Sequence, residues 1–400
     1  MKSVPTKPLR SMPSRRRLAP LALFAMAALD LSGSGAAAQQ RDGLEVQRGR
    51  HEKLEKRGNH SYYDAHWNLD DLPAYKPEQQ VSGTIRQWGS NYFSDSPLNQ
   101  YWEEGFRKFH PGVQFADEQK TALAAIPSLT FGMADLAPSR HITFDETLFF
   151  ERYKSRSPLE ITVVTGSLNV PGWSYALGIY VNKDNPLARL SIEQLDGIFG
   201  AQRDGGYDGT TWRTDIARGP EKNIRTWGQL GLTGEWADKP VDVYGYNLRY
   251  HIPRTFERQV FQGGDKWNEQ LHEFANYKNP DGSTELEGKQ AMEAVAKDRY
   301  GIAFSSMAFV DDRAKALAIA ARGSDNYVEL NLENVRARSY PLIDEVYFYL
   351  DREPGKPVDP KVREFLRYLL SREGQQAVQR DGKFMPLTAA AVREQLKKLE

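Results

Sequence analysis

Strand-like and helix-like segments alternate along the chain from Ser82 onward, and this alternation constrains the fold more than any other feature. Residues 84–88 are typical of a short strand, residues 98–109 place apolar side chains on one helical face, and residues 113–115 are typical of a second strand. A strand, a helix and a strand in quick succession predict a parallel α/β layer. The fold class we expect is therefore α/β.

The same alternation continues to the C-terminus. Ser191 and Gln194 have the spacing of a capping box that opens a helix. Further helices are expected over residues 121–126, 255–261, 286–297 and 362–370. Further strands are expected around residues 129–131 and over 159–165, 176–182, 241–244, 300–304 and 345–350.

Composition narrows the classes of protein that this pattern can serve. The chain has 400 residues, of which 40% are hydrophobic, which is enough for more than one packed lobe. It has no cysteine, so a disulfide-stapled fold and a Cys-ligated metal site are excluded. Its 53 basic and 53 acidic residues balance, which argues against a nucleic-acid or an anionic-membrane partner.

The first 38 residues have the organisation of a secretory signal peptide. A basic front that ends in Arg15, Arg16 and Arg17 precedes a short apolar run, and small residues follow at 36–38. We expect cleavage after Ala38 and export to the periplasm, by the general or the twin-arginine route. The apolar run is too short to span a bilayer, so a retained membrane anchor is the weaker alternative.

Beyond residue 38 the chain is mildly acidic. Residues 1–38 hold six basic residues and one acidic residue, so the remainder carries five more acidic than basic side chains. An anion would therefore have to be bound by local hydrogen-bond donors. Residues 39–81 are polar and form, by expectation, a partly disordered N-terminal extension in which Trp67 and Tyr75 could dock on the main body.

No catalytic constellation is found in the sequence. The nucleophile elbow, the phosphate-binding P-loop, the zinc-protease helix and the dinucleotide glycine fingerprint are all missing. The seven histidines are scattered, so no metal site and no cofactor are expected. What remains is a set of polar turns between strands and helices, such as residues 89–92, where helix N-termini offer N–H groups to an anion.

Several short motifs resemble, in order, those of the periplasmic phosphate-binding proteins that serve ABC importers. The resemblance covers nearly all of residues 82–387. The motifs that carry it are residues 89–90, 102–106, 110–113, 134–140, 180–187, 191–200, 300–304, 340–342, 371–375 and 383–387.

The resemblance implies a two-lobed periplasmic binding protein fold, with a hinge of two crossing strands and an inter-lobe cleft that closes on the ligand. The crossings would lie near Trp173 and at Tyr340-Pro341. Lobe I would then comprise residues 82–172 and 342–400, and lobe II residues 173–341. The family implies a non-catalytic monomer that captures inorganic phosphate or a related oxyanion and delivers it to an ABC permease.

Three elements of the family's binding site map onto the first half of the chain. Its first phosphate loop corresponds to Ser90, Asn91 and Tyr92. Its second helix N-terminus keeps one hydroxyl, Thr121. The third element is the loop after the third strand, which corresponds to Ser139 and Arg140.

The fourth element departs from the family pattern. The family places an arginine shortly before Ser-Gly-Thr at the start of a lobe II helix, whereas this chain has Arg249, Tyr250 and His251. Arg249 and His251 could still bind an anion, or could be a surface charge and a helix cap. Two other functions therefore stay open, a phosphate-ester hydrolase and an exported protein that keeps the fold without the ligand.

Overall fold

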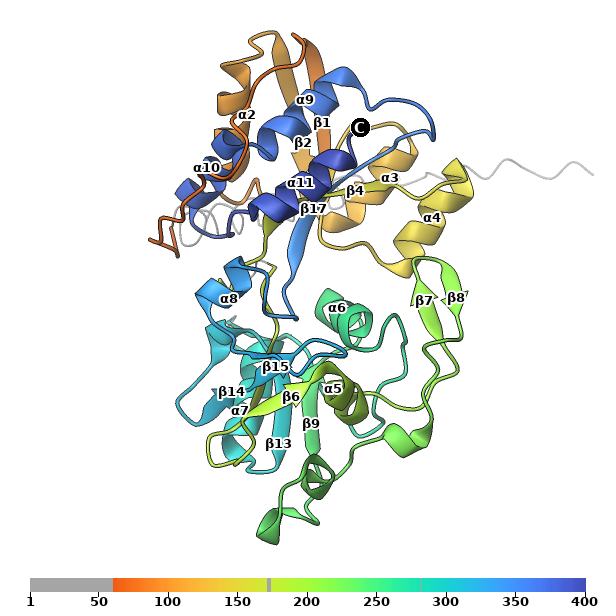
Figure 1. Cartoon of the computed structure of the whole chain (residues 1–400), viewed down its shortest axis with the longest axis vertical. Coiled ribbons are helices and arrows are strands. Elements are labelled where there is room, and N and C mark those ends of the chain that lie inside the picture. Colours follow the sequence, from red (N-terminus) through yellow and green to blue (C-terminus); the bar gives the residue numbers. More distant parts are fainter. Residues whose placement is uncertain (1–59, 171–173, 282) are drawn as a thin grey trace, which may run out of the picture. The chain divides into compact units, whose positions relative to one another are not determined.

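The computed structural model of the chain describes residues 60–170, 174–281 and 283–400 (Figure 1). The expected signal peptide, its cleavage after Ala38 and residues 39–59 lie outside these ranges. Within them, no helix is both long enough and apolar enough to cross a membrane.

The first lobe is built on a mixed sheet. Strands β1 (Gly83–Gly89) and β2 (Val113–Gln119) are parallel, and β17 (Glu345–Leu350) pairs antiparallel with both β3 (Ala137–Ser139) and β4 (Leu159–Thr165). An isolated bridge between Gln87 and Leu136 joins β1 to β3. The helices of this lobe are α2 (Leu98–Arg107), α3 (Ala125–Thr130), α4 (Phe144–Lys154), α9 (Pro360–Leu369), α10 (Arg372–Asp381) and α11 (Ala389–Lys397), with a short η2 at Ala122–Ala124.

Alternate side chains of β17 divide the packing of this lobe between two cores. Phe348 joins the large core, where its ring stacks on Phe93 and lies close to Trp102 of α2. Tyr347 and Tyr349 point the other way, into a smaller core with side chains of α3 and α4. This is the period-2 alternation of a strand that is covered on both faces.

The second lobe is built on another mixed sheet, in the order β10-β9-β13-β5-β14. Strands β9 (Asp242–Tyr246), β10 (His272–Phe274) and β13 (Gly301–Ser305) are parallel. Strand β5 (Gly178–Asn182) runs antiparallel to both of its neighbours, β13 and β14 (Ala314–Ala316). A smaller sheet contains β6 (Arg189–Ser191), β15 (Ala318–Ala320) and β16 (Tyr327–Val328). In addition, β7 (Gly206–Asp208) pairs with β8 (Thr211–Arg213) in one hairpin. In another, β11 (Tyr277–Lys278) pairs with β12 (Thr284–Glu285).

Helices cover the second sheet. They are α5 (Ile192–Phe199), α6 (His251–Val260), α7 (Glu287–Lys297) and α8 (Leu332–Arg336), with single 3-10 turns η3 (Pro220–Lys222), η4 (Trp227–Leu230), η5 (Gly234–Trp236) and η6 (Met307–Phe309). Phe256 of α6 packs on Phe199 of α5 and on Phe304 of β13. Helix α6 is thereby fixed to the sheet, and this matters because it carries candidate site residues.

Two segments connect the lobes, and they are hydrogen-bonded to each other. The Leu177 N–H donates to Leu342 O at 2.8 Å, the Gly166 N–H donates to Asp344 O at 2.8 Å, and the Tyr340 hydroxyl donates to Leu177 O at 3.0 Å. A Cβ on Gly166 would lie 2.3 Å from Asp344 O, so only glycine allows this approach. The predicted crossing at Tyr340-Pro341 falls in the second segment, whereas Trp173 is outside the described residues. The lobe boundaries at 172/173 and 341/342 stay a prediction.

Residues 60–81 pack on the first lobe. The Tyr75 hydroxyl donates to Glu364 of α9 at 2.7 Å and lies 2.7 Å from His110 Nε2, and the Leu168 N–H donates to the Tyr63 hydroxyl at 2.7 Å. Tyr63 and Tyr75 are both buried. The second half of the polar extension is thus tied to the lobe by its aromatic side chains.

The α/β fold predicted from the alternation is confirmed, and the capping box of Ser191 and Gln194 has both of its hydrogen bonds. One predicted strand is wrong, because residues 129–131 belong to α3 and the turn that ends it. Leu129 is buried in the smaller core, whereas Phe131 is exposed and is the C-cap of α3. The apolar side chain of Leu129 therefore belongs to the buried face of a helix and not to a strand. Helix α6 also begins earlier than predicted, at His251.

A buried polar network lies between α2 and the β1–β2 pair. Glu103 Oε1 accepts from Asn99 at 2.7 Å, Glu103 Oε2 accepts from Arg107 at 2.9 Å, and Asp117 accepts from Gln87 at 3.0 Å and from Asn99 at 2.9 Å. Burial and the neighbouring Asp117 carboxylate raise the pKa of Glu103 well above its usual range. The folded state therefore retains a proton on this carboxyl pair.

This proton makes the stability of the protein pH-dependent. Because the pKa of Glu103 is raised on folding, the contribution is complete below the ordinary carboxyl range of about 4–5 and is lost as the pH rises above it. Urea unfolding from pH 5 to pH 8.5 should show a loss of about 1–3 kcal/mol in the wild type. Glu103→Gln has nearly the same shape and can still donate a hydrogen bond, but its side chain does not titrate. The variant should therefore lose clearly less unfolding free energy over the same pH range. Equal losses in both proteins would contradict the assignment.

Candidate functional site

The carboxyl ends of β1 and β3 bring two of the predicted loops together. The Ser90 N–H donates to Pro138 O at 2.7 Å, and the Ser90 side chain is buried. A Cβ on Gly89 would lie 2.2 Å from Pro138 O, which explains the glycine before Ser90. Ser139 follows directly and is fully buried, and its hydroxyl finds no hydrogen-bond partner among the described residues.

Arg140 is held by the start of α4. Its Nη1 donates to Glu146 Oε2 at 2.8 Å and to His141 O at 2.9 Å, and its Nη2 donates to Glu146 Oε1 at 3.2 Å. Thr143 and Glu146 form a capping box at the same helix end. The guanidinium is therefore oriented by the protein before any ligand arrives, which lowers the entropic cost of using it as a hydrogen-bond donor.

Helix α6 of the second lobe presents one polar face. His251 is its first residue, and Arg258 follows seven residues later, two helical turns on, so both lie on the same side. His251 Nε2 and Arg258 Nε are buried and lack a hydrogen-bond partner within the described ranges. No ion pair within 4 Å involves Arg258 in the described part of the chain, although buried arginines normally have a partner.

The charged groups of the two lobes act on the pKa values of the histidines opposite them. Burial and the nearby Arg140 lower the pKa of His251 to about 4. Burial and the nearby Arg258 lower the pKa of His141 to about 3, with a smaller effect of Arg140. Each histidine is therefore neutral at physiological pH. The formal positive charge of the site comes from the two arginines.

Asp344 faces the same space from the second crossing segment. It is 2% exposed. The Glu345 N–H and the Ser174 hydroxyl act on its carboxylate, although neither oxygen makes a well-aligned hydrogen bond with a described residue. Burial raises the pKa of Asp344 to about 6, and Arg258 opposes that rise. Tyr92 also borders this group, since burial raises its pKa and the charges of Asp344 and Arg140 act on it.

Buried polar atoms without partners are rare in folded proteins, and here several come together. Arg140 acts on His251, and Arg258 acts on Asp344, so these four groups are near one another. His251 Nε2 and Arg258 Nε are buried without a partner, and Ser139, whose Oγ also has none, directly precedes Arg140. Donors and an acceptor that converge in this way are suited to a small polar ligand that offers both kinds of partner. We call Ser139, Arg140, His251, Arg258 and Asp344 the cleft group.

Of the nine predicted site residues, five lie in or beside the cleft group, namely Ser90, Tyr92, Ser139, Arg140 and His251. The other four are not joined to the cleft group by any contact among the described residues. Asn91 Nδ2 donates to Asp95, and Thr121 caps η2 and is exposed. Arg249 is exposed, and Tyr250 accepts from the Asn276 N–H at 3.1 Å within the second lobe.

Three residues of this region were not predicted from the sequence. Arg258 could have been found, because it has the seven-residue spacing from His251 that puts two side chains on one helical face. His141 follows Arg140 directly and could have been considered with it. Asp344 gave no local signal, since only the pairing of the two crossing segments places it here.

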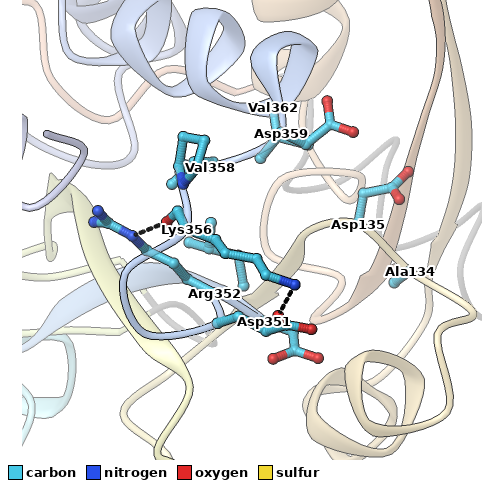
Figure 2. Close-up of a pocket in the computed structure, with 11 residues that line it drawn as sticks. Ala134, Asp135, Asp351, Arg352, Lys356, Val358, Asp359 and Val362 are labelled. Atoms are coloured by element: carbon cyan, nitrogen blue, oxygen red, sulfur yellow. Dashed lines mark hydrogen bonds and ion pairs between the residues drawn. The ribbon is translucent and has the colours of Figure 1, made fainter.

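A separate pocket on the first lobe does not have these properties. It is lined by residues 134–135, 350–353 and 356–359, with Val362 (Figure 2). Its charged groups already have partners: Arg352 donates to Lys356 O at 3.1 Å, and Lys356 pairs with Glu353. Residues outside the pocket pair with its three aspartates, Asp351 with Lys154, Asp135 with Arg86 and Asp359 with Lys361. It therefore offers a ligand no free charge comparable to that of the cleft group.

No three histidine or carboxylate side chains gather into a metal-binding group in the described ranges. The side chains of the cleft group offer hydrogen-bond donors, acceptors and charge. The cleft group includes no hydroxyl or carboxylate paired with a general base in the manner of a nucleophile.

The buried histidine predicts a stability difference in mild acid. Because the pKa of His251 is lowered to about 4, the unfolded chain binds a proton between about pH 6.5 and 4 that the folded protein excludes, so stability falls as the pH falls through this window. His251→Gln should reduce the loss between pH 7 and pH 4.5 by about 1–2 kcal/mol in urea unfolding. The exposed His272 is the control, because His272→Gln should leave the loss unchanged. An unchanged loss in His251→Gln would show that the histidine is not held neutral.

Comparison with known proteins shows the family of this chain. A family model described as a PBP superfamily domain matches residues 76–373. The phosphate-binding protein PstS of Pseudomonas aeruginosa is 30% identical over 329 residues, which cover 82% of this chain and 90% of that protein. Among solved structures, PstS from Borrelia burgdorferi has a TM-score of 0.48 at 12% sequence identity, and the match covers 77% of this chain and 100% of that one. An ABC-type phosphate transport receptor from Vibrio cholerae has a TM-score of 0.45 at 20% identity, and the match covers 76% of this chain and 100% of that one. The chain belongs to the PBP superfamily and, within it, to the family of the phosphate-binding protein PstS.

Proposed function

We propose that this protein is an extracytoplasmic solute-binding protein that captures inorganic phosphate, or a closely related oxyanion, at the cleft group. The observation that carries the proposal is the set of buried, unpartnered polar atoms of Ser139, His251 and Arg258, with the buried Asp344 carboxylate near Arg258. The name of the Pseudomonas aeruginosa relative supports phosphate as the first ligand to test. We expect a monomer that passes its ligand to an ABC permease in the membrane and that reaches the periplasm with a cleaved signal peptide.

Each residue of the cleft group has a distinct part in this proposal. Arg140 and Ser139 donate to the anion from the first lobe, and Arg258 supplies the opposing charge from the second. Charge-assisted hydrogen bonds of this kind are the strong ones. Neutral His251 has a ring nitrogen that can donate to the anion or accept from a protonated one, depending on its tautomer. Arg258 takes the part that the family resemblance gave to Arg249.

Asp344 accounts for selectivity between phosphate and sulfate. An ionised carboxylate can only accept hydrogen bonds, so it repels an anion whose oxygens carry no proton. Hydrogen phosphate carries a proton that Asp344 can accept, whereas sulfate does not at neutral pH. Asp344 therefore favours phosphate over sulfate.

The arginine assignment is tested by titration calorimetry with phosphate at pH 7.5. A charge-assisted hydrogen bond contributes roughly 1.5–3 kcal/mol, so Arg140→Ala and Arg258→Ala should each weaken binding by about ten- to a hundredfold. Arg249→Ala is the matched control and should bind within about twofold of the wild type, because its side chain is exposed. A large loss in Arg249→Ala with none in Arg258→Ala would restore the role first expected for Arg249.

The wild type itself decides between the remaining functions. If it binds neither phosphate, sulfate nor molybdate, the protein is one that keeps the fold without this ligand. If it releases phosphate from a phosphate ester, the binding proposal is replaced by hydrolysis.

The selectivity assignment has its own test. Asp344→Asn replaces an acceptor-only group by an amide that can also donate, so it should narrow the ratio of phosphate to sulfate affinity by about tenfold or more. Competition titrations with the two anions measure that ratio. An unchanged ratio would place the discrimination on another residue.

A further inference from the structure

The β7–β8 hairpin of the second lobe contacts helix α4 of the first. Thr210, at the tip of the hairpin, donates from its hydroxyl to Glu151 Oε2 at 2.6 Å. The rings of Tyr207 and Phe144 lie 4.6 Å apart between centroids. These two contacts join residues that are far apart in the sequence and belong to different sheets.

The base of the hairpin is firmly attached to the second lobe. The Tyr207 N–H donates to Gly263 O at 3.0 Å. Gly263 has a φ of +85°, and a Cβ there would lie 1.9 Å from Tyr207 O. A Cβ on Gly206 would likewise lie 2.7 Å from Gly264 N. Glycines thus allow the hairpin to lie directly against the turn that follows α6, so the hairpin moves with that helix.

On the other side, Glu151 is oriented before it meets the hairpin. Its second carboxylate oxygen accepts from the Ser157 hydroxyl at 2.5 Å. Phe144 is the first residue of α4, directly after the capping residue Thr143. The contact is therefore made at both ends of a helix whose N-terminus also holds Arg140.

Each side of the contact is thus joined to one half of the cleft group. The hairpin is attached to the end of α6, which carries His251 and Arg258, and α4 follows the loop that carries Ser139 and Arg140. Opening of the lobes would break both contacts, since their partners belong to different lobes. Closing them would form the contacts again.

We propose that the β7–β8 hairpin is an inter-lobe clasp that stabilises the closed cleft and slows release of the ligand. It contributes to affinity without touching the ligand, because an interaction made only in the closed state shifts the equilibrium toward that state. The effect on ligand release rests on the proposed function, whereas the effect on lobe closure does not.

The first experiment measures phosphate release by stopped flow. In Tyr207→Ala/Thr210→Val, which removes the ring contact and the hydroxyl donor, the release rate should rise about 3- to 10-fold with little change in the association rate. Tyr153→Ala is the matched control. Tyr153 is an exposed aromatic residue of the same helix α4 whose ring partners, Phe131 and Phe149, belong to the first lobe. An unchanged release rate in the double variant would overturn the clasp.

The second experiment needs no ligand. The chain has no cysteine, so Lys108→Cys in the first lobe and Asp312→Cys in the second provide two unique sites for a fluorescent donor and acceptor. Single-molecule energy transfer in the ligand-free protein should shift toward lower efficiency when the clasp residues are replaced, but not in Tyr153→Ala. If the wild type binds no phosphate and this shift is still seen, the clasp stands and the proposed function fails. Identical distributions would overturn the clasp.

Discussion

Pairing between the two crossing segments is the interaction on which the rest of the structure depends. The backbone bonds from Leu177 to Leu342 and from Gly166 to Asp344 are made between the segments that connect the lobes. The two crossing segments therefore form one short hydrogen-bonded ladder and do not act as independent linkers. A pair of hydrogen-bonded strands bends more readily than it slides, so relative motion of the lobes is restricted to rotation about this ladder. The same ladder places the Asp344 carboxylate between the lobes.

Charge in the cleft group is balanced in an unusual way. Two arginines and a carboxylate share a buried region, yet Arg258 and Asp344 are not joined by a direct ion pair within the described residues. Bringing such charges out of water is costly unless each finds a partner. Arg140 already has a partner in Glu146, whereas a ligand that accepts from Arg258 and donates to Asp344 would give both of those groups one. Preorganised groups of this kind bind well because the free-energy cost of removing water from them arises during folding and not during binding.

Much of the fold was predictable from local patterns, and the site was predictable only in part. The capping box of Ser191, the strand at residues 159–165 and the amphipathic helix near residue 365 depend on nearest neighbours, which a sequence displays directly. Ser139 and Arg140 were found because a motif marks them. Asp344 and the contact between Thr210 and Glu151 depend on long-range pairing, and Leu129 shows how a short apolar run suits a strand or a helix equally well.

The placement of Tyr75 has a consequence for how the chain is made. Its hydroxyl is bonded to Glu364, so the start of the described chain and the C-terminal helices belong to one packed body, whereas the sheet of the second lobe is formed by a continuous stretch of chain between the crossings. During synthesis, the second lobe has all its strands long before the C-terminal helices emerge. The first lobe cannot complete its core until α9 and β17 have arrived. The order of assembly is therefore opposite to the order in which the two lobes begin along the chain.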